Sequence, residues 1–340
     1  MADAVAAAIK QIAQRKSLTA AESAAAFNEI MQGSASAAQI AALLIGLRVK
    51  GESAEEVAGA AQALRAAMIR VDAPSPESLV DTCGTGGGVV GTFNISTAAA
   101  FTAAGAGVRI AKHGNRSFTS KCGSADVLEA LGIGIELQVE RLAGVLAEAG
   151  MVFMFAPTMH PAMRHVGPVR RELGVPTVMN IVGPLANPAS AGRQVVGVAD
   201  RARLPLIAEA LQRLGSVHAL VVHGEPGLDE LSPLGPSTVL EIRKGVITEW
   251  VLDPASHDLH SPHADHLAGG TPADNAALIE TIVNGGGPSG ARSAVLLNAA
   301  AAIYVGAGAP DFRTAISAAR DSLDAGRARE ALDKLRRATK

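Results

Sequence analysis

The sequence predicts an α/β fold with a small helical domain at its N-terminus, and three observations support this prediction. Residues 1–70 show helical periodicity throughout. From residue 79 onward, short β-like runs alternate with helical stretches, a pattern typical of a largely parallel central sheet. Pro74 and Pro76 separate these two parts. We therefore expect a helical domain over residues 1–72 and an α/β domain over residues 73–340.

The helical part has clear signals for a buried face and for a helix start. Ile40, Leu43, Leu44 and Leu47 follow the i, i+3, i+4, i+7 spacing of one apolar helix face. Ser53 precedes two acidic residues, as at the capped start of a helix.

The second part contains the expected strands. Five short apolar runs precede a late hairpin around Lys244-Gly245, and the tail from residue 311 to 340 is amphipathic helix. The run at 294–309 contains Asn298 and is short for a membrane span, so we expect a buried helix there. The expected strands are 79–82, 108–111, 152–155, 195–199, 219–222, 237–243 and 246–252, with helices at 96–104, 139–149 and 204–214.

Composition excludes several classes of protein. The chain has 340 residues, 48% of them hydrophobic, and a net charge of −2, so no global field attracts nucleic acid or acidic membranes. Its two cysteines, Cys83 and Cys122, are too few for a disulfide scaffold. The N-terminus has no signal-peptide pattern. We expect a soluble, cytoplasmic protein with no nucleic-acid or membrane partner.

The glycine-rich stretch at residues 81–97, DTCGTGGGVVGTFNIST, contains the spacing G-x-G-x-x-G at residues 86–91. A dinucleotide site also needs an acidic residue at the end of the next strand to bind the ribose. The expected strand 108–111 is followed instead by Lys112, His113, Gly114, Asn115 and Arg116. An NAD site is therefore not predicted.

The same loop is suited to a phosphate. Its glycines let backbone N–H groups approach an anion, and side-chain donors follow where a helix begins. Lys112 and Arg116 reach the same sheet edge from the next strand. A capped glycine turn without ligand is the alternative for either loop alone. The donors of the first loop include Gly84, Gly87, Gly88, Asn94, Ser96 and Thr97.

Two further stretches carry candidate site residues. The turn at 223–231, HGEPGLDEL, places Asp229 and Glu230 after an apolar strand, and adjacent carboxylates of this kind suit Mg²⁺ near a phosphate. The stretch at 159–173 gathers His160, His165 and several arginines, of which Arg170 or Arg171 is suited to a substrate carboxylate. On spacing alone, a solvated acidic loop is the favoured interpretation of this turn, and the expected proximity to a diphosphate-sized anion site favours the metal site instead.

Together these stretches resemble the anthranilate phosphoribosyltransferase family. The likeness runs in order through GTGG and TFNIST (84–97), KHGNRSFTSKCGSADVLEALG (112–132), the stretch FAPTMHPAMRHVGPVRRELGVPT with GPLANPA (155–189) and GLDEL (227–231). Residues 29–65 also resemble that family's helical domain. The resemblance implies a fold similar to class II nucleoside phosphorylases, with residues 165–185 returning to the helical domain, and a homodimer joined through the helical domains.

The resemblance also implies a reaction and its site. Phosphoribose passes from 5-phosphoribosyl 1-diphosphate (PRPP) to the amine of anthranilate, with two Mg²⁺ ions per monomer. Ser96, Asp229 and Glu230 correspond to metal ligands, and Gly84, Asn115, Arg170 and His160 to the anthranilate side. The positions that correspond to PRPP-binding residues are Gly84, Gly87, Gly88, Thr92, Asn94, Ile95, Ser96, Thr97, Lys112, His113, Gly114, Asn115, Arg116, Ser117, Phe118, Thr119, Ser120 and Ser124.

One position departs from the family pattern. The usual loop reads GTGGD, and this chain has Gly88 where the family has Asp. We expect altered affinity for PRPP or Mg²⁺ with retained activity, because the backbone donors remain.

Two other functions share this architecture. One is a pyrimidine nucleoside phosphorylase, but the motifs KHGNR and GLDEL resemble the phosphoribosyltransferase family more than the phosphorylases. A non-catalytic nucleic-acid-binding relative predicts a basic stripe and steep salt dependence, which the net charge and the Asp229–Glu230 pair disfavour.

Overall fold

The computed structural model describes residues 3–88, 90–117 and 121–340. A seven-stranded sheet with the order β3-β2-β1-β4-β5-β6-β7 forms its centre. The first five strands in this order are parallel, and β6 and β7 are antiparallel. The strands are β1 Val80–Gly84, β2 Ile110–Gly114, β3 Met151–Phe155, β4 Arg193–Gly197, β5 His218–Gly224, β6 Ser237–Arg243 and β7 Val246–Leu252.

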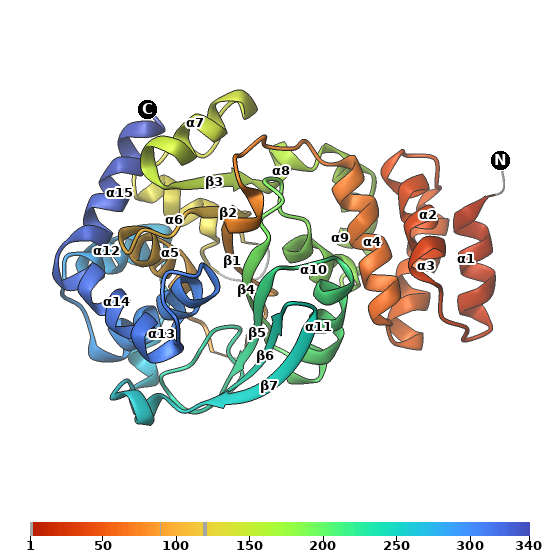
Figure 1. Cartoon of the computed structure of the whole chain (residues 1–340). Helices are drawn as coiled ribbons and strands as arrows, with labels where there is room; N and C mark the ends of the chain where they lie inside the picture. Colours follow the sequence, from red (N-terminus) through yellow and green to blue (C-terminus); the bar gives the residue numbers. More distant parts are fainter. Residues whose placement is uncertain (1–2, 89, 118–120) are drawn as a thin grey trace.

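Helices cover both faces of the sheet, as Figure 1 shows. One face packs against the helices after β1 and those of the C-terminal part, and the other packs against α11 and the segments around α4 and α10. The pleat divides β4 accordingly, since Val195 lies in the first apolar cluster and Val196 in the second. The helices on the first face are α5 Ile95–Gly105, α6 Ser124–Ala130, α7 Val139–Ala149, α12 Pro272–Val283, α13 Ser289–Val305, α14 Phe312–Asp324 and α15 Arg327–Ala338.

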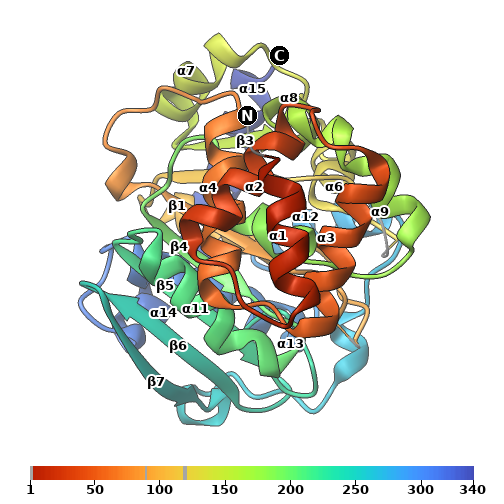
Figure 2. The same cartoon turned by 90° about the vertical axis from the view of Figure 1, so that its right-hand side faces the viewer.

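The N-terminal helices form a bundle beside the second face (Figure 2). Ser36 and Ser53 begin α3 and α4 with capping boxes, as the sequence signals at Ser53 predict. Val166 and Val169, from residues 165–185, lie in the same apolar cluster as these helices. The helices of this side are α1 Ala4–Ala13, α2 Ala20–Met31, α3 Ala37–Lys50, α4 Ala54–Ala67, α9 Gly167–Leu173, α10 Met179–Val182 and α11 Leu204–Arg213. The short helix α8 Ala156–Met159 follows β3, and its Met159 lies in the first apolar cluster.

The predicted end of the second strand is wrong. The strand continues through Lys112 and His113 to Gly114, because these residues pair with Phe153, Met154 and Phe155 of β3. Their polar side chains concealed the strand, which is buried on both sides. The C-terminal tail forms two helices, because the chain turns at Gly326 with a φ of 72°.

The apolar run near residue 300 is a buried helix, as expected. α13 packs against α5 and α14, and no helix in the described part of the chain is long and apolar enough to cross a membrane. Asn298 in α13 is 2% exposed, and its side-chain amide binds both backbone groups of Leu231, each at 2.9 Å. This polar residue therefore attaches the turn that carries Asp229 and Glu230 to the central helix.

We predict that Asn298→Leu lowers the free energy of unfolding by about 2–4 kcal/mol, because it leaves two buried backbone groups of Leu231 without partners. Urea unfolding followed by circular dichroism measures the change. Asn284→Ala, at the exposed C-cap of α12, is the control and should cost less than about 1 kcal/mol. Equal losses for the two variants would contradict this role of Asn298.

Candidate active site

The glycine loop, the stretch after β2 and the acidic turn all follow the carboxyl ends of parallel strands. The chain moves outward from β1 through β2 to β3 in one direction and from β4 to β5 in the other. The strand order thus reverses between β1 and β4, and open α/β sheets bind ligands in the crevice at such a point. The glycine loop after β1 and the acidic turn after β5 lie on either side of β4 and meet above its end.

The glycine loop packs directly against the acidic turn. The Gly86 N–H donates a hydrogen bond of 2.8 Å to Oδ2 of Asp229. A Cβ at Gly84 would lie 2.5 Å from the same oxygen, so the close approach requires glycine there. Gly86 and Gly87 have φ values of 68° and 81°, which glycine adopts without strain.

Glu230 lies beside the start of the helix that follows this loop. Its Oε1 accepts a hydrogen bond of 3.1 Å from the Ser96 N–H, near the N-terminus of α5. Burial, assisted by the charge of Asp229, raises the pKa of Glu230 to about 8, although Lys112 and the Ser96 N–H oppose the shift. Burial also raises the pKa of Asp229. Two adjacent carboxylates that resist ionisation in this way are stabilised by a bound cation.

Lys112 is buried beneath the glycine loop, whereas the sequence suggested a cation at the strand end. The whole residue is 2% exposed. Its ammonium donates hydrogen bonds to the carbonyl and hydroxyl oxygens of Thr82 and, at 3.2 Å, to Oγ of Ser96. Burial lowers the pKa of Lys112, and the nearby charges of Asp81 and Glu230 oppose that shift. Because Lys112 lies within β2, its side chain points to one face of the sheet, and there it reaches Ser96 at the start of α5.

Asn94 joins three segments at the start of α5. Its amide donates to the carbonyl of Cys122 at 3.2 Å, and its Oδ1 accepts from Asn275 of α12 at 2.9 Å. The buried hydroxyl of Thr97 has no hydrogen-bond partner among the described residues. Thr92 forms an isolated β-bridge with Ala268 and thereby fixes the end of the loop.

The stretch after β2 forms its own network above α6. Arg116 makes ion pairs with Glu129 and, at 3.1 Å, with Asp126, and its guanidinium lies 5.5 Å from the ring centre of Phe155. The Ser124 hydroxyl donates to the Asn115 carbonyl at 3.3 Å. Arg116 is thus already paired with carboxylates. Of the remaining predicted residues, Ser117 follows in the described chain, and Phe118, Thr119 and Ser120 lie outside the described residues.

A buried pair of histidines connects β2 with the segment after β3. Nε2 of His113 and Nε2 of His160 lie 3.2 Å apart, so the N–H of one imidazole donates a hydrogen bond to the bare nitrogen of the other. Burial lowers the pKa of His113 to about 3 and that of His160 to about 4. Both rings are therefore neutral at pH 7.

Asp81 and Asn187 hold this region in place, and sequence analysis missed both. Asp81 accepts from the His113 N–H at 3.1 Å and from the Asn187 amide at 2.8 Å. Burial raises the pKa of Asp81 to about 6, although the charge of Lys112 opposes the shift. An acidic residue inside the apolar run 79–82 was the available sequence signal.

Arg170 lies on α9, at the edge of the helical bundle. Its side chain is half-buried, and none of the described residues forms a side-chain hydrogen bond or ion pair with it. Burial lowers the pKa of the Arg170 guanidinium. Arg171 is exposed, and the ring of His165 packs against Gly33, where a Cβ would lie 2.6 Å from it. Of the residues in this stretch, Arg170 has the features of an anion-binding side chain.

The donor set at the acidic turn fits a hard divalent cation. Asp229, Glu230 and the Ser96 hydroxyl offer only oxygen ligands. The Gly86 N–H binds Asp229 and the Ser96 N–H binds Glu230, so these hydrogen bonds connect the acidic turn to the glycine loop and to the start of α5. Mg²⁺ prefers carboxylate, hydroxyl and phosphate oxygens. These residues are therefore suited to hold Mg²⁺ next to a phosphate in the glycine loop.

Comparison with known families and structures places this site in context. A model described as "Glycosyl transferase family, a/b domain" matches residues 76–329, and one described as "Glycosyl transferase family, helical bundle domain" matches residues 6–68. The fold is thus that of a glycosyltransferase with a helical bundle domain and an α/β domain. Within this class, the chain belongs to the anthranilate phosphoribosyltransferase family.

Relatives and solved structures agree with this assignment. The chain is 50% identical to an anthranilate phosphoribosyltransferase of Chloroflexus aggregans over 96% of both chains, and 48% identical to one of Rubrobacter xylanophilus over 98% and 97%. The Thermus thermophilus enzyme superposes with a TM-score of 0.92 at 41% identity, covering 98% and 99% of the chains. A Saccharomyces cerevisiae enzyme in complex with PRPP and Mg has a TM-score of 0.89 at 28% identity, covering 100% and 98%.

The histidine pair predicts a specific pH dependence of stability. A histidine whose pKa is lowered on folding supports the fold above its unfolded pKa of about 6.5, and this support is lost as the pH falls toward the folded value. The stability advantage of the unmodified chain over His160→Asn should therefore be about 2 kcal/mol smaller at pH 5 than at pH 7.5. Urea unfolding at several pH values tests this, and a difference independent of pH would contradict it.

Proposed function

We propose that this chain transfers the phosphoribosyl group of PRPP to the amine of anthranilate and releases pyrophosphate. The observation that carries the proposal is the meeting of a glycine loop with two carboxylates at the strand switch point, together with a half-buried arginine on α9 whose side chain has no hydrogen-bond or ion-pair partner among the described residues. The loop and the carboxylates are suited to a metal-bound diphosphate, and the arginine is suited to an aromatic carboxylate. The family membership supports the same pair of substrates.

We assign PRPP to the glycine loop and the stretch after β2. Backbone N–H groups of the loop and the N-terminus of α5 supply donors for the diphosphate, and the buried Lys112 contributes positive charge beneath it. Thr97, whose buried hydroxyl has no partner among the described residues, adds a further donor. Arg116 serves this stretch by ordering it through its ion pairs with Glu129 and Asp126.

We assign two Mg²⁺ ions to the carboxyl end of the sheet, one with the Ser96 hydroxyl and one with Asp229 and Glu230. Mg²⁺ supplies charge neutralisation for the departing pyrophosphate. Residues of this chain hold the two carboxylates at the carboxyl edge of the sheet. The N–H groups of Gly86 and Ser96 bind Asp229 and Glu230, and Asn298 binds the backbone of Leu231.

We assign the carboxylate of anthranilate to Arg170. A half-buried guanidinium without another partner forms strong charge-assisted hydrogen bonds with a carboxylate. Asn115 and Gly84 border the reaction centre from the opposite side. His160 acts by positioning, since its ring contacts His113 and remains neutral.

The reaction needs orientation more than a strong base. An aromatic amine is neutral at pH 7 and attacks C1 of the ribose once it is held in line, as the pyrophosphate leaves. Loop and helix N–H groups, with Lys112, stabilise the negative charge that develops on the leaving group. Approach of the helical bundle to the α/β part excludes water, which otherwise hydrolyses PRPP.

We further propose that residues 1–72, with 165–185, form one domain and the remainder of 73–340 the other. The ranges of the two family matches support the boundary near residue 72, and Val166 and Val169, which lie in one apolar cluster with the N-terminal helices, support the return of residues 165–185. We also propose a homodimer joined through the helical domains, where Val49 of α3 is 78% exposed. Sedimentation equilibrium measures the oligomeric state, and a Val49→Glu variant should shift it toward monomer.

Arg170→Ala should lower kcat/KM for anthranilate about 30-fold, since loss of a charge-assisted pair costs about 2 kcal/mol. The KM for PRPP should change little. The loss of anthranilate fluorescence on mixing with PRPP and Mg²⁺ measures the rate. Arg171→Ala removes the adjacent exposed charge and is the matched control. Equal effects of the two variants would contradict the assignment of Arg170.

Gly88→Asp should lower the Mg²⁺ concentration for half-maximal activity by about threefold to tenfold. A Cβ at Gly88 lies 3.5 Å from Oδ1 of Asp229, so the new carboxylate joins the existing pair. Gly88 is not among the residues with positive φ, so its backbone conformation allows a side chain, although a Cβ there lies 3.2 Å from the Gly227 carbonyl oxygen and needs a small shift of that turn. Gly88→Asn has the same size without the charge and serves as control. An unchanged Mg²⁺ profile in the Asp variant would refute the effect.

A further inference from the structure

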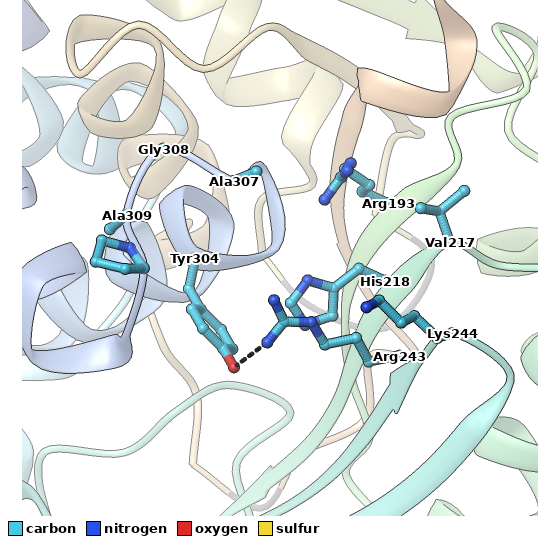
Figure 3. A pocket seen from close by; sticks show the side chains of 10 residues that line it. Arg193, Val217, His218, Arg243, Lys244, Tyr304, Ala307, Gly308 and Ala309 are labelled. Carbon is cyan, nitrogen blue, oxygen red and sulfur yellow. Dashed lines mark hydrogen bonds between the residues drawn. The ribbon is translucent and has the colours of Figure 1, made fainter.

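A basic pocket lies at the edge of the sheet opposite the candidate active site. We define the basic pocket by Arg193, His218, Arg243, Lys244 and Tyr304, and its volume is about 480 Å³. Arg193 and His218 are the first residues of β4 and β5, whereas the candidate active site lies at the last residues of these strands. Figure 3 shows these side chains around one opening between the end of α13 and the strands.

The topology brings the cations together. β6 runs antiparallel to β5, so Arg243 at the end of β6 pairs with His218 at the start of β5. Lys244 follows directly in the turn to β7. Two segments that are distant in sequence therefore contribute three cations to one opening, and the ring of His218 lies beside them.

These cations lack acidic partners. Among the described residues, no carboxylate forms an ion pair with Arg193, Arg243 or Lys244. Arg193 donates to the carbonyls of Glu77 and Val305, which carry no net charge. No hydrogen bond is formed by the Lys244 ammonium with any residue of the described ranges.

Glu241 lies beside the basic pocket, and both of its carboxylate oxygens already accept hydrogen bonds. Oε1 accepts from Nε2 of His218 at 2.8 Å and from the Tyr304 hydroxyl at 2.9 Å, and Oε2 accepts from Nε1 of Trp250 at 3.0 Å. Burial alone would raise the pKa of Glu241, but these three hydrogen bonds hold it below its ordinary value. Glu241 is 8% exposed, and among the described residues it forms no ion pair with Arg193, Arg243 or Lys244.

The pocket also has an apolar wall. Val217, Ala309 and Pro310 line it, and the guanidinium of Arg243 lies 5.9 Å from the ring centre of Tyr304. A cationic rim around a partly apolar cavity of this size matches a small molecule that joins a multiply charged anion to a ring.

We propose that the basic pocket binds a small organic phosphate. The phosphate dianion lies among Arg193, Arg243 and Lys244, and the organic part lies against Tyr304 and Pro310. This site is separate from the PRPP and anthranilate positions, because the length of the strands lies between them. Its occupant makes no contact with the glycine loop or the acidic turn.

Lys244 offers a variant that removes charge without harming the fold. Lys244 and Gly245 have φ values of 52° and 75°, and hairpin turns with two positive φ values favour the sequence Asn-Gly. Lys244→Asn should therefore retain or improve the turn. Combined with Arg243→Gln, it removes two of the three cations.

Isothermal titration calorimetry with phenyl phosphate tests the proposal, with inorganic phosphate and benzoate as comparison ligands. In the unmodified chain, phenyl phosphate should bind more tightly than either. The Arg243→Gln/Lys244→Asn variant should bind it at least tenfold more weakly, and Lys244→Asn alone should show a smaller loss. Circular dichroism checks that each variant is folded.

The control removes two exposed cations elsewhere, with Lys10→Asn and Arg320→Gln, and should leave the affinity unchanged. Phenyl phosphate that binds at the candidate active site should do so equally in the unmodified chain and in the Arg243→Gln/Lys244→Asn variant. The difference in affinity between these two proteins therefore reports on the basic pocket. Equal affinity in both, or a loss as large in the control variant, would overturn the proposal.

Discussion

The burial of the Lys112 ammonium between β1, β2 and α5 is the constraint on which the site depends. A cation that is 2% exposed must have its donors satisfied, and Thr82 and Ser96 satisfy them. This arrangement fixes the start of α5 relative to the two strands that precede and follow it. It also requires negative charge nearby, which Asp81 and Glu230 supply. The glycine loop is thus attached to a rigid base, and its N–H groups are available for a ligand.

The acidic turn completes the site from the other side of the switch point. Its position depends on Asn298, which holds Leu231, and on Gly86 and Ser96, which bind the two carboxylates. Because burial raises the pKa of both carboxylates, the site is unfavourable for two negative charges alone and favourable when a divalent cation is present. The metal and diphosphate sites that we propose would therefore be coupled through the same few side chains.

Arg170 shows how the bundle of N-terminal helices contributes to function. It lies on α9, a short helix that contacts α3, and Val169 of α9 and Val166 just before it lie in one apolar cluster with the N-terminal helices. The arginine that we propose for the anthranilate carboxylate is thereby carried by one part of the molecule, and the loop that we propose for the diphosphate is carried by the other. A change in the relative position of the two parts alters both substrate positions together, which suits a reaction that depends on alignment.

The sequence by itself determined the fold class, the glycine loop and the acidic turn, because periodicity, glycine spacing and adjacent carboxylates are local properties of the chain. The resemblance to a family added the assignments of Arg170 and Asn115. Local pattern failed at Lys112 and His113, whose polar side chains concealed a strand that neighbouring strands bury. Tertiary structure alone decided that Asp81 and Asn187 support His113, that Arg116 is paired with Glu129, and that Arg243 and Lys244 face Arg193. Each of these contacts joins residues whose proximity depends on strand order, which no local pattern encodes.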